Sequence, residues 1–179
     1  MPNKYKFPIF CLLVLLALGE RLWWDMGWNV ELVTVGVLLS GIYLGKRWAV
    51  AFLVIVMGIS DLVLGNTNIW WFTWSAFLLE GVWGRRVWFG VGTAIGASLW
   101  FYLWTNFGVW LLDGWGMYSN DLAGLMQSYV NALPFLKANL LSNLIIVPMG
   151  FGVVEGSKWI LNKLCLMNKV SISRRAILN

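Results

Sequence analysis

The sequence predicts an all-α, polytopic membrane protein with six transmembrane helices and an amphipathic helix in the loop between the fifth and the sixth. Hydrophobic residues make up 60% of the 179 residues and charged residues only 12%. The mean hydropathy is +0.73, so there is too little polar surface to cover a soluble globule. The apolar residues come in near-continuous runs without the alternation of barrel strands. Because a hydrocarbon core of ~30 Å needs ~20 residues of helix, these runs predict helices.

Short polar breaks such as "GKR", "GNTN" and "GRR" separate the apolar runs. The first run follows Lys4 and Lys6, but no small-residue cleavage motif comes after it, so we expect an uncleaved helix rather than a signal peptide. The second and fourth runs are short for a full crossing. The predicted spans are residues 7–24, 31–45, 48–65, 69–84, 87–112 and 138–165.

The six spans form one predicted transmembrane domain over residues 1–165, followed by a basic tail over residues 166–179. Basic residues fall at the N-terminus, at every second break and at the C-terminus, which leaves only Arg21 and Lys137 near the other face. Cytoplasmic loops carry the excess of Lys and Arg, so both termini and the tail are predicted to be cytoplasmic. This topology explains the net charge of +5, and no nucleic-acid partner is predicted.

Polar residues inside the spans gather on the predicted outer half. An ionisable group in lipid is costly, so such residues face protein or water. One interpretation is hydrogen bonds that hold helices together. The other is a ligand pocket, which the many Trp and Tyr rings at the same level favour. The candidate substrate-binding residues are Asn29, Glu31, Asp61, Trp70, Trp74, Asn106, Trp110, Tyr118, Gln127, Tyr129, Asn139 and Asn143.

The loop sequence "SNDLAGLMQSYVNALPFL" predicts the amphipathic helix. Ser119 and Asn120 are possible N-caps, and Pro134 is predicted to end the helix. The segment is too short and polar to cross a membrane, so we expect it to lie on the outer face. It is either a simple interfacial helix or a lid over the pocket, and a lid would use side chains such as Gln127 and Tyr129.

The sequence lacks the residues that several kinds of catalytic and metal-binding site need. It has no His, which argues against His-based acid–base catalysis and most zinc sites. Its two cysteines, Cys11 and Cys165, are too few for a metal cluster, and neither a P-loop nor a dinucleotide glycine fingerprint occurs. We therefore predict no catalytic residues, no metal and no cofactor. Pairs of small residues such as Gly41 with Gly45 predict close helix packing.

Two blocks of sequence carry a family resemblance. They are "GVLLSGIYLGKRWAVAFLVIVMGISDLVLG" at residues 36–65 and "TNFGVWLLDGWGMYSNDLAGLMQSYVNALPF" at residues 105–135. They resemble a bacterial membrane family of unknown function whose members show an "LLSDLLLG" third span and a "TNFGVW" motif. Here Ser128 stands where that family has Cys, Ser119 where it has Pro, and Asn143 where it has Asp.

That family in turn resembles the substrate-binding S components of energy-coupling factor (ECF) transporters. The resemblance implies a bacterial inner-membrane protein that is not an enzyme. It would capture a small vitamin-like or heterocyclic molecule at the outer face and pass it inward with an ECF transmembrane subunit and ATPases. The first span offers only Ala17 and Gly19 as a small-residue docking pattern, so a solitary transporter stays open.

Two other functions stay open. A structural or scaffold subunit of a membrane complex would account for the packing glycines, and it predicts polar residues that pair with one another around no cavity. A membrane enzyme acting on lipid or glycan would use Asp61 or Glu31 as a base.

Overall fold

The computed structural model describes residues 3–24, 32–65, 68–83, 91–113 and 116–178. Within them the chain is all-α, as predicted. The helices are α1 (Asn3–Gly19), α2 (Leu32–Leu39), α3 (Lys46–Leu64), α4 (Trp70–Trp83), α5 (Val91–Leu112), α6 (Leu122–Asn131) and α7 (Leu133–Leu178), and two π-helical turns, η1 (Glu20–Trp24) and η2 (Ser40–Leu44), extend α1 and α2.

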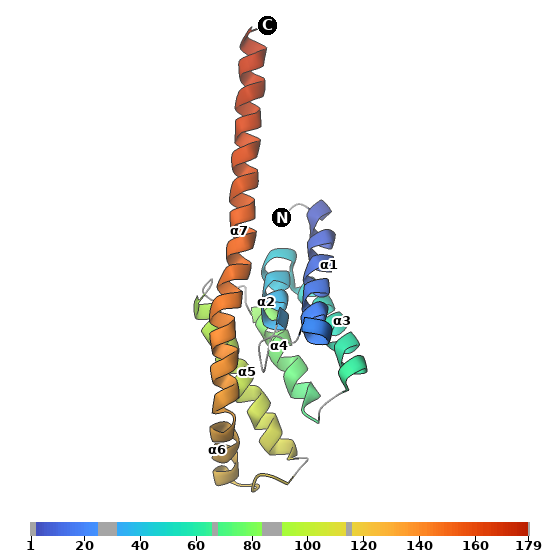
Figure 1. Cartoon of the computed structure of the whole chain (residues 1–179), viewed down its shortest axis with the longest axis vertical. Coiled ribbons are helices and arrows are strands. Elements are labelled where there is room, and N and C mark those ends of the chain that lie inside the picture. The colour runs from blue at the N-terminus through green and yellow to red at the C-terminus, as the bar shows by residue number, and fades with distance from the viewer. Residues whose placement is uncertain (1–2, 25–31, 66–67, 84–90, 114–115, 179) are drawn as a thin grey trace.

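Every predicted span overlaps a helix, and successive helices run in alternate directions apart from the short α6 (Figure 1). Within the described part of the chain, three segments are long and apolar enough to cross a membrane, namely Tyr5–Trp24, Lys46–Leu64 and Leu133–Ile160. Among the helices that match predicted spans, the shorter ones are α4, with 14 residues, and α2 with η2, which together cover Leu32–Leu44. At 1.5 Å per residue, helices of that length reach only ~20 Å.

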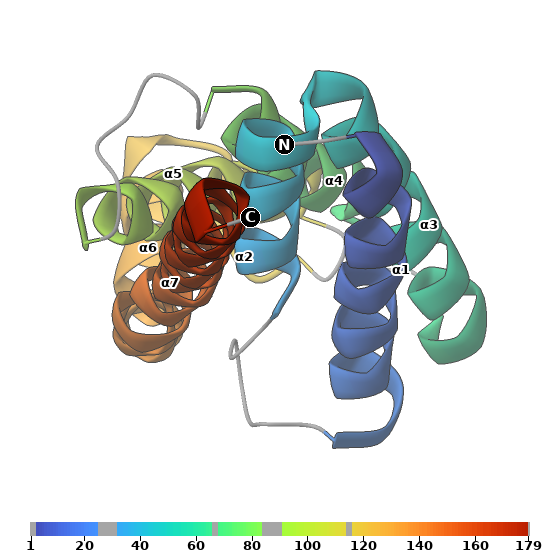
Figure 2. The same ribbon diagram turned by 90° about the horizontal axis from the view of Figure 1, so that it is seen from above.

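Helix α2 lies at the centre of the bundle. All its residues from Val33 to Leu39 are buried, as expected for a helix that is apolar all round. One side packs with α1, α3 and α4 around Phe52 and Phe77. The other packs with α5 and α7 around Val147 and Phe151. Viewed from above, α2 separates α1 and α3 from α7 (Figure 2). This short helix therefore joins two sets of longer ones.

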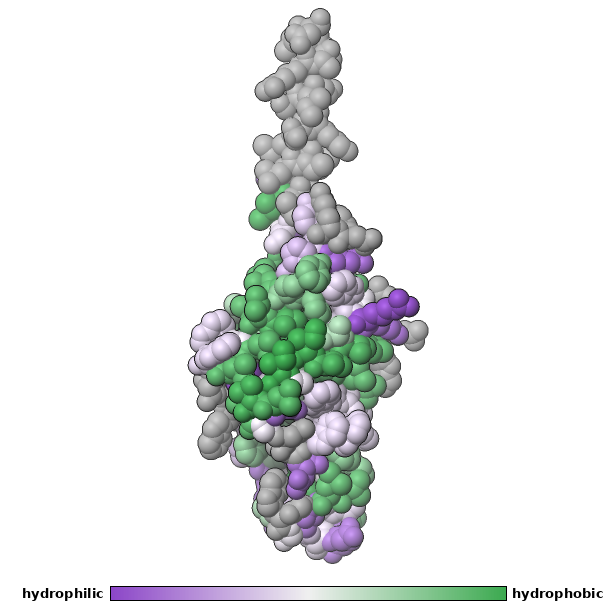
Figure 3. Space-filling view, turned by 90° about the vertical axis from the view of Figure 1, so that its right-hand side faces the viewer, coloured by the Kyte–Doolittle hydropathy of each residue, from purple (hydrophilic) through white to green (hydrophobic). Residues whose placement is uncertain are grey.

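The outside of the bundle is strongly apolar. On the side where α1 and α3 lie, a broad hydrophobic area covers the middle of the molecule, with polar residues beyond it (Figure 3). The exposed apolar residues of these two helices include Phe7 and Leu15 of α1 and Val54 and Leu62 of α3. A further exposed stripe follows α7 at every fourth position, from Leu141 to Val153. Such surface suits contact with lipid.

The boundaries of α6 and α7 differ from the predicted ones. Helix α6 ends at Asn131 rather than at Pro134. Pro134 instead lies in the first turn of α7, where the missing N–H breaks no hydrogen bond of the helix. The N-cap of α6 is Asp121, whose side chain accepts from the Gly124 N–H, and not Ser119 or Asn120. Helix α7 continues to Leu178, so the backbone of the predicted tail is helical.

The backbones of η2 and α4 approach each other closely. A Cβ added to Gly41 would overlap the carbonyl oxygen of Gly81, and one added to Gly81 would overlap Val37. The partner that the sequence suggested for Gly41 is not involved, because Gly45 has a φ of 116° and open space around its Cβ position. The two glycines therefore let the short α2 unit sit directly against α4.

Gly41→Ala should lower the free energy of unfolding by about 1–3 kcal/mol, because a methyl group must push α4 away from η2. Thermal unfolding of the purified protein in mild detergent measures the change. Gly96→Ala in α5 is the matched control, since nothing lies within 4 Å of its Cβ position. Equal melting temperatures for the two variants would contradict the close contact.

Candidate functional site

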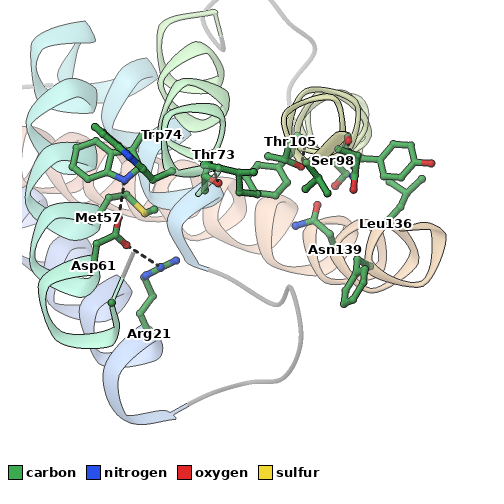
Figure 4. A pocket seen from close by; sticks show the side chains of 17 residues that line it. Arg21, Met57, Asp61, Thr73, Trp74, Ser98, Thr105, Leu136 and Asn139 are labelled. Atoms are coloured by element: carbon green, nitrogen blue, oxygen red, sulfur yellow. Dashed lines mark hydrogen bonds and ion pairs between the residues drawn. The ribbon is translucent and has the colours of Figure 1, made fainter. Parts of the chain in front are cut away.

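A cavity of about 380 Å³ lies between the helices at the end of the bundle away from the two termini (Figures 1 and 4). The chain direction explains its position, because the ends of α1 and α3 and the starts of α4 and α7 meet there, beside α5. It is lined by Arg21, Met57, Asp61, Gly65, Ile69, Trp70, Thr73, Trp74, Ser98, Phe101, Tyr102, Thr105, Asn106, Val109, Phe135, Leu136 and Asn139.

One end of the cavity is charged. The Arg21 guanidinium lies 3.8 Å from Asp61 Oδ1, and the two side chains are only 15% and 14% exposed. Trp74 Nε1 donates to Asp61 Oδ2 at 2.8 Å. Arg21 Nε donates to Ser60 Oγ at 3.0 Å. The acid is thus offset by a cation and an indole N–H, which connects η1, α3 and α4.

The other end is neutral and polar. Asn143 Nδ2 donates to Ser98 Oγ at 2.9 Å and to Asn139 Oδ1 at 3.0 Å. Asn143 is fully buried between α5 and α7, and Ser98 and Asn139 face the cavity in front of it. Figure 4 shows Asn139, Ser98 and Thr105 on the opposite side of Thr73 from Asp61 and Arg21. A ligand in this cavity meets an ion pair at one end and amides and hydroxyls at the other.

Aromatic rings form much of the wall between these ends. Trp70 and Trp74 meet edge to face, with ring centroids 5.8 Å apart, and Phe101 and Tyr102 line the α5 side. Flat rings at such positions favour a planar guest, because stacking adds ~0.5–1.5 kcal/mol beyond buried area.

Helix α6 is fastened to α5 outside the cavity. Tyr102 Oη donates to the Tyr129 carbonyl oxygen at 2.7 Å, and Tyr129 Oη donates to the Leu103 carbonyl oxygen at 3.1 Å. Ser128 Oγ lies 3.3 Å from the Asn106 carbonyl oxygen. No residue of α6 lines the cavity. The segment for which a lid was one of two interpretations therefore lies beside the site and contacts its lining residues Tyr102 and Asn106.

The predicted site residues divide into three groups. Asp61, Trp70, Trp74, Asn106 and Asn139 line the cavity, and Asn143 supports it from behind. Four lie elsewhere, namely Trp110, Tyr118, Gln127 and Tyr129. Of these, Trp110 donates a hydrogen bond to the Ser119 carbonyl oxygen. Asn29 and Glu31 lie outside the described residues.

Sequence reasoning missed Arg21, Thr73, Ser98, Phe101, Tyr102 and Thr105. Arg21 carried a usable signal, because it is one of only two basic residues near the predicted outer face. Among the described residues, no group of three or more His, Cys, Asp or Glu side chains is placed to hold a metal ion.

Residues 2–164 match DUF6580, which is described as a family of unknown function. The chain belongs to this family. No curated protein and no solved structure gives a significant match. Membership of DUF6580 agrees with the resemblance to a family of unknown function that the "LLSG…SDLVLG" and "TNFGVW" blocks carry. The family description assigns no activity, so the cavity is the feature that bears on function.

The ion pair at the charged end of this DUF6580 site has a testable energetic role. Arg21→Gln should lower the free energy of unfolding by about 1–3 kcal/mol, because it leaves the Asp61 carboxylate buried beside no cation. Adding Asp61→Asn should recover part of that loss. Thermal unfolding of both single variants and the double variant in detergent gives the coupling energy. Strictly additive losses would contradict a direct interaction.

Lys158→Gln is the control for that cycle. Lys158 contacts Glu155 at 2.9 Å, but both side chains are exposed, so its loss should change the free energy of unfolding by no more than about 1 kcal/mol.

The N-cap of α6 predicts a response to acid. Hydrogen bonds from the Ser119 hydroxyl and then from the Gly124 and Ala123 N–H groups hold the pKa of Asp121 below its usual value. The ionised cap thus stabilises α6 fully above a pH of about 4, the ordinary carboxyl range, and this contribution is lost as the pH falls through the lowered pKa. Amide exchange protection in α6 should fall on acidification.

Asp121→Asn keeps an acceptor for the Gly124 N–H but cannot titrate. Its α6 protection should therefore be lower at neutral pH and should change little with acid, whereas Asp113→Asn should behave like the unmodified chain. An acid response of equal size in Asp121→Asn would show that another group is responsible.

Proposed function

We propose that this protein is a membrane-embedded substrate-binding component of the ECF S-component type, which captures a small vitamin-like or heterocyclic molecule at the outer face of the bacterial inner membrane. The cavity is the observation that carries the proposal. Its volume of about 380 Å³ lies within the usual range of small-molecule sites, and its few convergent polar groups among aromatic walls are typical of them.

The proposed membrane topology has six crossings and cytoplasmic termini. Its support is the alternation of helix direction in Figure 1 and the clustering of basic residues at the N-terminus, at every second break and at the C-terminus. With that orientation the cavity opens on the outer half. The short α2 and α4 then cross a locally thinned bilayer or are completed by neighbouring helices.

In the proposed cycle the protein carries out no covalent chemistry. The ligand enters between the ends of α1, α3, α4, α5 and α7, and is delivered inward when the bundle reorients. A shared ECF transmembrane subunit and its cytoplasmic ATPases would drive that step. In a solitary transporter, the concentration gradient of the ligand would be the only driving force for its delivery.

A scaffold subunit is the second candidate, and one observation favours it. Asp61 is already offset by Arg21 and Trp74, and Asn143 joins α5 to α7, so part of the polar interior pairs with itself as a scaffold requires. The cavity left between these two polar contacts is what a scaffold does not require.

Purification in mild detergent, followed by mass spectrometry of co-purified small molecules, tests the proposal. The unmodified chain should retain a heterocyclic compound, and Trp70→Leu and Asn106→Leu should retain at least about tenfold less of it, because each removes a wall or a polar edge of the cavity. Trp159→Leu is the matched control, since Trp159 is exposed near the other end of the bundle.

The scaffold alternative makes the opposite prediction. If no small molecule is retained under several growth conditions, while the same partner proteins co-purify with all three variants, the capture proposal is wrong.

A further inference from the structure

The hydrogen bonds of the lining residues show an imbalance between donors and acceptors. Trp74 Nε1 is used by Asp61, and the Thr105 hydroxyl donates to the Phe101 carbonyl oxygen at 2.7 Å. The Tyr102 hydroxyl donates to the Tyr129 carbonyl oxygen. Asn106 Nδ2 donates to the Tyr102 carbonyl oxygen at 2.7 Å. The protein itself therefore uses one donor on each of these four lining side chains.

The acceptors on the same side chains are left for a guest. Asp61 Oδ1 is 3.8 Å from the Arg21 guanidinium, which is beyond hydrogen-bond distance. The amide oxygen of Asn106 and the hydroxyl lone pairs of Thr105 also have acceptor capacity once their hydrogens are committed elsewhere. These acceptors come from α3 and α5, which border the same cavity.

The walls add a second requirement. Trp70, Trp74, Phe101, Tyr102 and Phe135 surround the space, and ring faces attract both flat aromatic guests and positive charge. A guest that is flat and rich in N–H donors satisfies the acceptors and the rings together. A guest rich in oxygen acceptors meets mostly other acceptors.

We propose that the ligand is a planar heterocycle bearing amino groups, of the aminopyrimidine or diaminoquinazoline kind, whose N–H groups donate to Asp61 and to the Asn106 and Thr105 oxygens. This inference rests on the proposed capture function and specifies its substrate class. Ser98 also lines the cavity, and its hydroxyl can donate to a ring nitrogen of such a base. Because Arg21 offsets Asp61, the site accepts a neutral base as well as a protonated one.

Isothermal titration of the full-length protein in mild detergent tests the proposal with two probes of the same ring. In one, 2,4-diaminoquinazoline, both substituents donate hydrogen bonds. In the other, 2,4-dimethoxyquinazoline, both accept. The diamino compound should bind at least about tenfold more tightly, because the dimethoxy compound leaves the cavity acceptors desolvated and unpaired. Equal affinity, or tighter binding of the dimethoxy compound, overturns the proposal.

Two variants locate the effect. Asp61→Asn and Thr105→Val should each weaken binding of the diamino probe, the first by at least about tenfold and the second by a few-fold, since a charged acceptor is worth more than a neutral one. Thr105→Val preserves the side-chain shape, so it keeps the test valid if Asp61→Asn folds poorly. Asp113→Asn is the matched control, because Asp113 lies beyond the end of α5 and outside the cavity. Unchanged affinity in both cavity variants also overturns the proposal.

The outcomes separate this inference from the proposed function. If neither probe binds but the co-purified compound is retained and lacks donor groups, the substrate class is wrong and capture stands. If no small molecule binds at all, both fail.

Discussion

The contact of Arg21 with Asp61 is the constraint on which the rest of the cavity depends. A carboxylate and a guanidinium, each about one-seventh exposed, are tolerated in an apolar bundle only when they offset one another. Meeting this condition brings the π-helical turn at the end of α1 against the end of α3, and the Trp74 indole brings α4 to the same point. The charged end of the cavity is thereby also the junction of three helices.

A second polar contact, from Asn143 to Ser98 and Asn139, joins α5 to α7 on the other side. The space between the two contacts persists because the lining groups are satisfied within the protein: Thr105, Asn106 and Tyr102 each donate to a backbone carbonyl. Side chains whose donors are used in this way do not need to move into the cavity to find a hydrogen-bond partner. The same commitments leave the acceptors on which the proposed ligand class rests.

The sequence predicted the helices well, because runs of apolar residues and polar breaks are local signals. Five of the residues that it singled out line the cavity, because polar or aromatic residues within a span need a partner: Asp61, Trp70, Trp74, Asn106 and Asn139. Their role in binding a substrate stays a prediction. The sequence did not predict Arg21 as part of the site, because a basic residue at a span end also fits a topology signal. Nor did it place Tyr129, since the position of α6 depends on reciprocal hydrogen bonds with Tyr102 and Leu103 that have no pattern in the sequence. Close packing at Gly41 was expected, but its partner Gly81 is forty residues away and is set by tertiary structure.

The far end of the bundle bears on how a captured ligand would leave. There Tyr43 Oη donates to Glu155 Oε1 at 2.6 Å, Lys158 contacts the same carboxylate at 2.9 Å, and its ammonium lies 4.0 Å from the Tyr43 ring centroid. Together with the Gly41–Gly81 approach, these contacts fasten η2 to α7 and to α4. Opening a passage through that end would break a charge-assisted cluster and a backbone contact that tolerates no added methyl group. For the proposed importer, reorientation of the whole bundle therefore breaks fewer contacts than the opening of a gate inside it. A partner protein that binds the bundle and drives its reorientation fits this arrangement better than a gate does.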